Sequence, residues 1–243
     1  PPNLAKITSP VNNSLVGAMV KIVVEAQDQL SGIGRVDFFA DGSFIGSDDS
    51  NTFEFVWDAS EVEAGIHKLF AKAFDLAGNN LQSETIMVNV DNIIPTMDSA
   101  ITTSKTTINV TFSQDLGPST LNISDFNVSG FTIVSGIVSG KVVILTVSEM
   151  PTDATPDIKY TQGTLADLVD NLVPSGMVKA KDGVPPEMIL AVTVNVFRID
   201  VFFGEDLDLA TVSKTDFIVM NGNLPLGIAS IEKNNNRVTL NIA

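Results

Sequence analysis

An internal repeat constrains the fold of this 243-residue chain more than any other feature of its sequence. A fixed period identifies repeated structural modules before any strand or helix is assigned. Three collinear blocks share an offset of 91 residues, and a fourth follows after a four-residue insertion in a hairpin loop of the later copy: Asp91–Met97 with Asp182–Met188, Ile108–Leu116 with Ile199–Leu207, Asp125–Phe126 with Asp216–Phe217, and Val142–Val147 with Arg237–Ile242. The chain therefore contains two copies of one module after a segment of different sequence.

The repeat sets the predicted domain boundaries. We expect an N-terminal domain at 1–92, a first repeat copy at 93–182 and a second repeat copy at 183–243. The second copy lacks counterparts of two strand-like stretches of the first, Asp157–Tyr160 and Met177–Lys181. A sandwich without these strands would have an open edge and an uncovered core face. We therefore expect the second copy to be truncated, with its remainder in a longer parent chain.

Apolar residues alternate along short segments throughout the chain. Phe53, Phe55 and Trp57 share one parity, and a second series follows at His67, Leu69, Ala71 and Ala73. A period of two indicates strands with one buried and one exposed face. Helical patterns are nearly absent, and only Asp58–Ala64 could form a helical turn. The sequence predicts an all-β chain of antiparallel β-sandwiches, each of which needs about 100 residues. We expect Trp57 to be buried between the sheets, with these inward neighbours: Val23, Phe38, Leu69 and Ala71.

Three motifs of the N-terminal domain, Asp37–Gly42, Phe53–Asp58 and Gly65–Asn79, resemble a family of bacterial immunoglobulin-like domains. Phe112–Leu116 and Phe203–Leu207 resemble a second class of such repeats. The resemblance implies tandem immunoglobulin-like sandwiches arranged as a rod, in an extracellular protein of the cell surface or S-layer. Such arrays occur in S-layer proteins, in adhesins and beside extracellular polysaccharide hydrolases. The resemblance implies no activity, because a fold does not fix a function.

Composition excludes several kinds of partner. The net charge of −15 would repel a nucleic-acid backbone and would attract divalent cations. The absence of cysteine excludes a disulfide framework and zinc–thiolate sites. No run of eighteen apolar residues occurs, so we expect no membrane span in this segment.

Residues suited to catalysis are scarce. The single histidine, His67, lies on the inward parity of a predicted strand, where a structural role is expected. No glycine-rich phosphate loop leads from a strand into a helix. Paired carboxylates such as Asp48-Asp49 exist, but a glycosidase also needs aromatic side chains that stack on sugars, and the chain has one Trp and one Tyr. The sequence therefore predicts that the chain is not an enzyme.

Acidic and amide side chains gather on the loops that meet at one pole of each predicted sandwich. Calcium prefers six to eight oxygen ligands, which carboxylates, amides and carbonyls of converging loops could supply. The alternative is that Asp, Asn and Gly form turns here through their own hydrogen bonds. The candidate calcium ligands are Asp28, Asp75, Asn79, Asp91, Asn92, Asp115, Asp167, Asp170, Asp182, Glu205 and Asp206.

Two function classes follow. The first is a non-catalytic structural segment of a cell-surface protein, which spaces and stiffens an S-layer lattice or a stalk. Its partners would be neighbouring copies of itself or other surface-layer subunits. The alternative is a carbohydrate-binding or accessory module of a secreted polysaccharide-degrading enzyme or adhesin, with cell-envelope polysaccharide as the partner. That alternative requires an exposed row of aromatic side chains, whereas most Phe residues occupy alternating strand positions where burial is expected.

Overall fold

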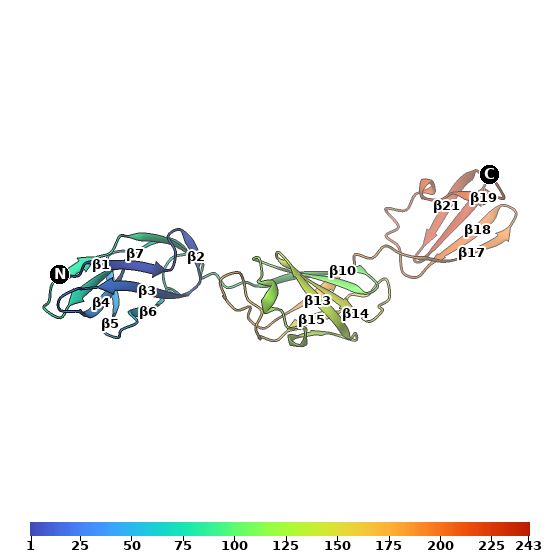
Figure 1. Ribbon diagram of the computed structural model, residues 1–243. Helices are drawn as coiled ribbons and strands as arrows, with labels where there is room; N and C mark the ends of the chain where they lie inside the picture. The colour runs from blue at the N-terminus through green and yellow to red at the C-terminus, as the bar shows by residue number, and fades with distance from the viewer. The chain divides into compact units, whose positions relative to one another are not determined.

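The computed structural model describes all of residues 1–243 and contains β-strands and three short 3-10 helices but no α-helix (Figure 1). The all-β prediction is confirmed. No helix has the length and apolar character needed to cross a bilayer. The chain divides into two compact units: one comprises Pro1–Thr96, Gln114–Leu121 and Gln162–Pro174, and the other comprises Met97–Ser113, Asn122–Thr161 and Ser175–Ala243.

The first nine strands form an immunoglobulin-like sandwich, which we call the first sandwich. One sheet has the order β1-β3-β6, and the other has the order β2-β9-β7-β4-β5, with β8 paired to β7. All of these pairs are antiparallel except β2 with β9. The strands are β1 (Leu4–Ser9), β2 (Ser14–Val16), β3 (Met19–Gln27), β4 (Ile33–Ala40), β5 (Ser43–Asp48), β6 (Glu54–Asp58), β7 (Gly65–Asp75), β8 (Asn80–Gln82) and β9 (Ile86–Val90).

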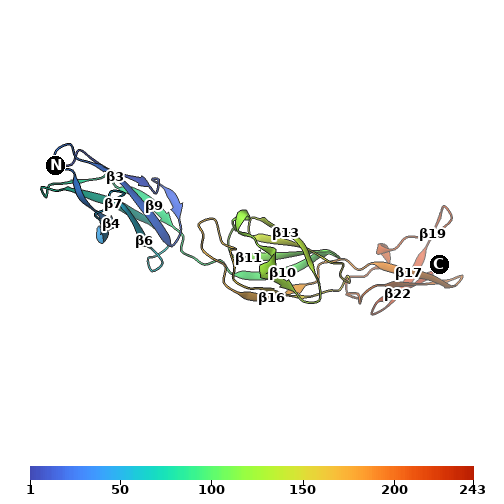
Figure 2. The ribbon, with the colours of Figure 1, turned by 60° about the horizontal axis from the view of Figure 1, so that its bottom comes forward.

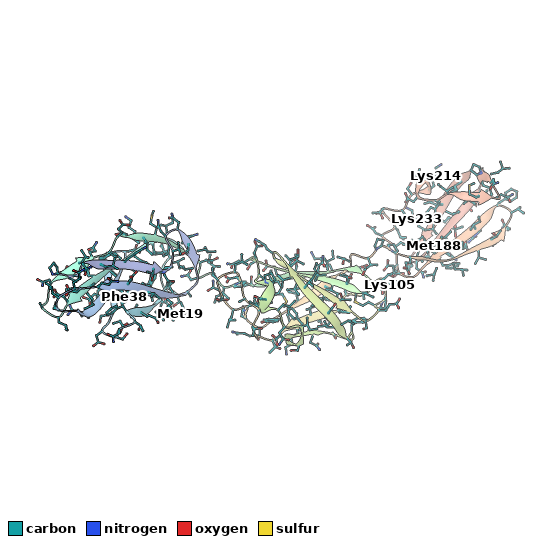
Figure 3. The ribbon with its side chains drawn as sticks, in the orientation of Figure 1. Met19, Phe38, Lys105, Met188, Lys214 and Lys233 are labelled. Atoms are coloured by element: carbon teal, nitrogen blue, oxygen red, sulfur yellow. The ribbon has the colours of Figure 1, made fainter.

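The core of the first sandwich lies between these two sheets. Trp57 is 5% exposed, and its predicted neighbours Phe38, Leu69 and Ala71 are fully buried. Figure 3 labels Phe38 inside this sandwich. The prediction for Val23 is wrong, since β3 buries Val20, Ile22 and Val24 and turns Val23 toward the opposite face. Because apolar residues are contiguous along Ile22–Val24, alternation alone could not decide which of them point inward.

The next seven strands form the first repeat copy. They are hydrogen-bonded in the order β12-β15-β16-β10-β11-β14-β13. Strand β16 pairs in parallel with β10, at Ala100 and Ala180, and antiparallel with β15, so it joins the two halves of the predicted sandwich (Figure 2). The strands are β10 (Met97–Ser104), β11 (Thr107–Phe112), β12 (Phe126–Val128), β13 (Ile133–Ser139), β14 (Val142–Val147), β15 (Asp157–Tyr160) and β16 (Gly176–Lys181).

The last six strands form the second repeat copy. Four pair in the order β17-β18-β22-β21, and β19 and β20 form a separate hairpin. The turns before β14 and β22 have equal length, so the inserted residues lie earlier, at the β19–β20 hairpin. The strands are β17 (Met188–Asn195), β18 (Arg198–Phe203), β19 (Val219–Asn221), β20 (Leu224–Leu226), β21 (Ile228–Asn234) and β22 (Arg237–Ile242).

The register of the two copies agrees with the sequence repeat. Met97 pairs with Phe112 in the first copy, and Met188 pairs with Phe203 in the second. Both hairpins have irregular registers at the same two places. The 3-10 helices Ile123–Asp125 and Lys214–Asp216 also lie 91 residues apart. The repeat therefore specifies local structure down to the position of individual bulges.

Candidate functional site

His67 has a structural environment. Its Nδ1 lies 2.6 Å from Asp41 Oδ2, and its Nε2 lies 2.7 Å from the carbonyl oxygen of Glu63. Its ring packs edge-on against Trp57. Burial works to lower the pKa of His67, but the hydrogen bonds to Glu63 and Asp41 outweigh burial and raise it. Because Asp41 and the carbonyl oxygen of Glu63 are both acceptors, these contacts favour the protonated ring, and they give His67 a structural role.

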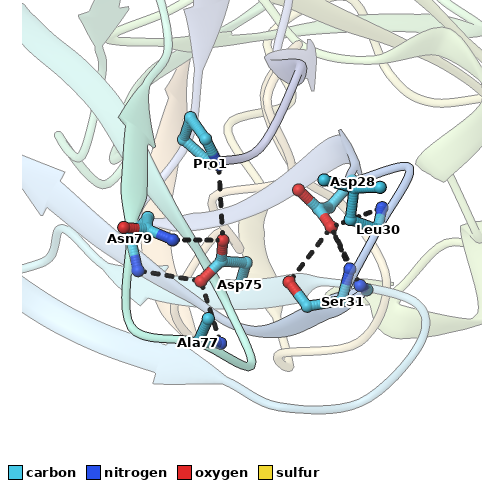
Figure 4. Close-up of polar contacts among 8 residues, drawn as sticks. Pro1, Asp28, Leu30, Ser31, Asp75, Ala77 and Asn79 are labelled. Carbon is cyan, nitrogen blue, oxygen red and sulfur yellow. Dashed lines mark hydrogen bonds and ion pairs between the residues drawn. The ribbon is translucent and has the colours of Figure 1, made fainter.

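Asp28 shapes the loop between β3 and β4. Its Oδ1 accepts hydrogen bonds from the backbone N–H groups of Leu30, Ser31 and Gly32 at 3.0, 2.6 and 3.0 Å, and also from the Ser31 hydroxyl (Figure 4). The backbone N–H of Ser31 contributes most to lowering the pKa of Asp28. This arrangement is an Asx turn, in which an acidic side chain replaces a backbone acceptor.

Asp75 and Asn79 close the loop between β7 and β8. Asp75 Oδ1 accepts from the backbone N–H groups of Ala77 and Asn79, and Asp75 Oδ2 accepts from Asn79 Nδ2 at 2.8 Å (Figure 4). The amino group of Pro1 lies 3.5 Å from Asp75 Oδ2. The Asn79 side chain contributes most to lowering the pKa of Asp75. Hydrogen bonds within the turn therefore engage both carboxylate oxygens of the buried Asp75.

The same loop occurs in the first repeat copy. Asp167 Oδ1 accepts from the backbone N–H groups of Val169 and Asn171, and Oδ2 accepts from Asn171 Nδ2 at 2.8 Å. Asp170 is exposed and has a φ of 67°, at the position where the first sandwich has Gly78 with a φ of 88°. Asp tolerates this left-handed conformation better than most residues. Asp170 therefore has a turn-forming role that its sequence position alone did not reveal.

The segment around Asp91 is held by hydrogen bonds on both sides. Asn92 Nδ2 donates to the carbonyl oxygens of Ala59 and Val62, each at 2.8 Å. Asn171 Nδ2 donates to the carbonyl oxygen of Asp91 at 2.8 Å, and Gln114 Nε2 donates to that of Ile93 at 3.1 Å. The backbone N–H of Asp91 donates to Val16. Asn92 thus positions this segment through its amide.

Gly17 allows a close backbone approach near the same segment. A Cβ atom added at Gly17 would lie 2.2 Å from the carbonyl oxygen of Val169, a distance that no side chain tolerates. Only glycine fits here without movement of the backbone. Gly17 and Gln114 are two structural residues that sequence reasoning missed. The offset of 91 residues pairs Gln114 with Glu205 and could have drawn attention to it.

The remaining predicted ligands differ in their surroundings. Asp115 and Asp206 are exposed, and Asp182 Oδ1 accepts from the backbone N–H of Val184 at 2.9 Å. Glu205 is 7% exposed, and neither of its carboxylate oxygens has a hydrogen-bond partner. No group of three or more His, Cys, Asp or Glu side chains is placed to hold a metal ion. Calcium binding therefore stays a prediction. Among the predicted ligands, Glu205 is the one whose two carboxylate oxygens are buried without a hydrogen-bond partner.

Aromatic side chains also lie on the outer face of the first sandwich. The rings of Phe39 and Phe70 stack with centroids 4.7 Å apart, and Phe44 packs edge-on against Phe39 while remaining 59% exposed. Arg35 lies over the ring of Phe74, 4.1 Å from its centroid. The expectation that alternating Phe residues are buried therefore fails for this face.

Comparison with known proteins agrees with the fold. Residues 4–71 match the family model of the bacterial Ig domain. No curated protein sequence matches the chain. Among solved structures, the Clostridium thermocellum CbhA fibronectin(III)-like modules share 22% identity, cover 37% of this chain and 99% of their own, and give a TM-score of 0.34.

Two tandem structures match across most of this chain. The I9–I11 tandem from titin shares 12% identity, covers 98% of this chain and 89% of its own, and gives a TM-score of 0.35. The Bacteroides ovatus protein SGBP-B, solved with a mixed-linkage heptasaccharide, shares 15% identity, covers 96% of this chain and 58% of its own, and gives a TM-score of 0.26. These likenesses concern the fold alone. The sheet topology and the match of residues 4–71 to the bacterial Ig domain identify tandem immunoglobulin-like β-sandwich domains, a type typically found on extracellular or surface proteins and typically without catalytic activity.

Proposed function

We propose that this chain is a non-catalytic structural segment of a cell-surface protein. The segment spaces and stiffens a longer chain, in an S-layer lattice or in a stalk. The observation that carries the proposal is the hydrogen bonding of Asp91–Ile93, whose backbone and side chains are held on both sides. A connecting segment fixed in this way suits a spacer, because a free linker would let neighbouring domains reorient. The proposed partners are neighbouring copies of the same protein or other surface-layer subunits.

The location can be tested on intact cells. Antibodies raised against the 243-residue chain should label the surface of unbroken source cells, and electron microscopy should show that deletion of the segment thins or disorders the surface layer. Labelling only after cell lysis, or only of protein released into the medium, would contradict the proposal.

One observation favours the second candidate function, a polysaccharide-binding module. Phe44 is 59% exposed and packs against the partly buried Phe39, and sugar stacking requires an exposed aromatic ring of this kind. The stacking of Phe39 and Phe70 opposes this function, because each ring covers one face of the other and removes it from contact with a sugar. The hollow of about 680 Å³ beside β1, lined by residues that include Leu4, Lys6 and Glu84, contains no aromatic side chain.

Affinity electrophoresis in gels that contain cell-envelope polysaccharide separates the two functions. The structural proposal predicts that polysaccharide does not retard the chain. Retardation that is lost in Phe44→Ala but kept in Phe197→Ala, a matched exposed phenylalanine of the second repeat copy, would favour the binding function instead.

A further inference from the structure

Glu205 is a buried acid without a partner. It follows β18 and is 7% exposed, and neither of its carboxylate oxygens is accessible to solvent or completes a hydrogen bond. Removing a charged carboxylate from water without compensation is strongly unfavourable. A buried carboxylate of this kind therefore requires either a proton or a cation.

The surroundings of Glu205 add negative charge. Burial is the main cause that raises the pKa of Glu205, and the carboxylates of Asp182, Asp153 and Glu187 raise it further. The hydroxyl of Thr152 opposes this shift but does not complete a hydrogen bond. The charges of these three acids therefore add to the effect of burial on Glu205.

Lys105 is paired with one of these acids, Glu187. Lys105 Nζ lies 2.5 Å from Glu187 Oε2, and this hydrogen bond is the main cause that raises the pKa of Lys105. Figure 3 labels Lys105. Since Lys105 pairs with Glu187, it leaves the carboxylate of Glu205 without a counter-charge.

Backbone contacts bring the surrounding segments together. The N–H of Gly204 donates to the carbonyl oxygen of Glu187 at 2.9 Å. A Cβ atom added at Gly204 would lie 3.7 Å from the hydroxyl oxygen of Thr152. The segment before β17 and the loop between β14 and β15 therefore each place an oxygen atom close to Gly204, the residue before Glu205.

The first repeat copy has a glutamine at the position of Glu205. At an offset of 91 residues, Glu205 corresponds to Gln114, whose Nε2 donates to the carbonyl oxygen of Ile93. An ionised glutamate offers only acceptors and cannot replace that donor. The exchange of Gln for Glu therefore removes this donor and adds a buried negative charge. A cation bound at Glu205 would offset that charge.

We propose that Glu205 is the central ligand of a divalent-cation site, with calcium as the ion, between the segment 182–187 and the loop 148–156. Calcium accepts mixed shells of carboxylate, carbonyl, hydroxyl and water oxygens, whereas magnesium demands near-ideal octahedral geometry and retains water. Because no three acidic side chains converge here, carbonyl, hydroxyl and water oxygens complete the shell around Glu205. Such a shell predicts the weak affinity of extracellular modules, with a Kd of about 10⁻⁴–10⁻³ M. This site deepens the proposed function and rests on it, since a cation here would stiffen the segment.

Isothermal titration calorimetry of the full 243-residue chain with CaCl₂ at pH 7 tests the site. The chain should bind one calcium ion, and Glu205→Gln should weaken that binding by more than about tenfold. This variant places the residue of the first repeat copy in the second, so the fold should be retained, which circular dichroism can verify. Asp206→Asn is the matched control, because it removes one charge from the exposed neighbour and should leave the affinity within about twofold.

Three results would overturn the site. They are no calcium binding by the unmutated chain, equal binding by Glu205→Gln, and equal losses in Glu205→Gln and Asp206→Asn. A melting transition that rises on acidification from pH 7 to pH 5, but does not respond to calcium, would assign a proton to Glu205 instead and would also overturn it. None of these results bears on surface location, which the antibody labelling of intact cells tests separately.

Discussion

The two repeat copies contain the same hairpin in opposite environments. Strand β10 pairs with β11 on one side and with β16 on the other, and it buries Ala100 and Thr102. Strand β17 pairs with β18 in the same register, yet all eight of its residues are exposed, and its second edge has no partner among the 243 residues. The repeat sequence therefore specifies pairing and bulges locally, whereas burial depends on strands supplied from elsewhere in the chain.

The two copies also differ in polar content. In the second copy the buried Asp200 accepts from the Thr239 hydroxyl at 2.7 Å and from Arg198 Nε at 3.2 Å. The corresponding positions of the first copy hold Asn109 and Ile144. In the second copy, the buried apolar core consists of Val201, Val238, Leu240 and Ile242. The second copy therefore depends more on charge pairs and less on apolar burial.

Equivalent phenylalanines should reveal the largest difference between the copies. Phe112 is 1% exposed, whereas its counterpart Phe203 is only partly buried. We expect Phe112→Ala to destabilise the first copy by about 3–5 kcal/mol, and Phe203→Ala to destabilise the second by less than about half of that. Urea unfolding of the first copy can be followed by Tyr160, the only tyrosine, and that of the second by hydrogen exchange. Equal losses in the two variants would show that the copies have equivalent cores.

Hydrogen exchange should reveal the next largest difference, between the open edge of β17 and the covered edge of β10. The amides of Ile101 and Ala100 lie beside β16, whereas Val192 and Ala191 occupy the equivalent open edge. We expect amides on the open edge of β17 to exchange at least roughly tenfold faster than their β10 counterparts, because nothing in the chain covers them. Similar protection in both strands would mean that another molecule pairs with β17 in solution.

The smallest expected effect concerns pH. The hydrogen bond from Thr239 is the main cause that lowers the pKa of Asp200, and the charges of Arg198 and Arg237 add to it. A depressed folded-state pKa gives stability that is present above the unfolded value of about 3.9 and is lost as pH falls through the folded value. Acidification below pH 4 should therefore lower the melting temperature of the second copy more than that of the first. Asp200→Asn should remove this difference, and a variant that keeps it would assign the pH dependence to other carboxylates.

Much of the fold could be predicted from sequence because it depends on local patterns. The repeat predicted that 93–182 and 183–243 share one module, and alternation predicted the buried face of β7. Alternation failed at Val23, where apolar residues are contiguous. It also failed at Phe39 and Phe70, which are apolar but pack on each other at the outer face.

The site was harder to predict because Asp and Asn serve turns and metals equally well. Asp28, Asp75 and Asp167 have backbone donors that only the folded loop reveals. The importance of Gln114 came from its partner, the carbonyl oxygen of Ile93, and no motif marks such a contact. Glu205 was identified by its position after a strand, but its burial without a donor depends on Thr152 and the loop around it.

The proposed spacer function requires that the connecting segment Asp91–Ile93 be fixed. Because the chain has no cysteine, spin labels can be placed selectively at Ser47→Cys in β5 and Ser135→Cys in β13, both exposed positions. Electron–electron double resonance should give one narrow distance distribution. Gly17→Ala, which forces the backbone away from Val169, should broaden it. A broad distribution in the chain with native Gly17 would contradict the claim, because a freely bending linker cannot set a spacing.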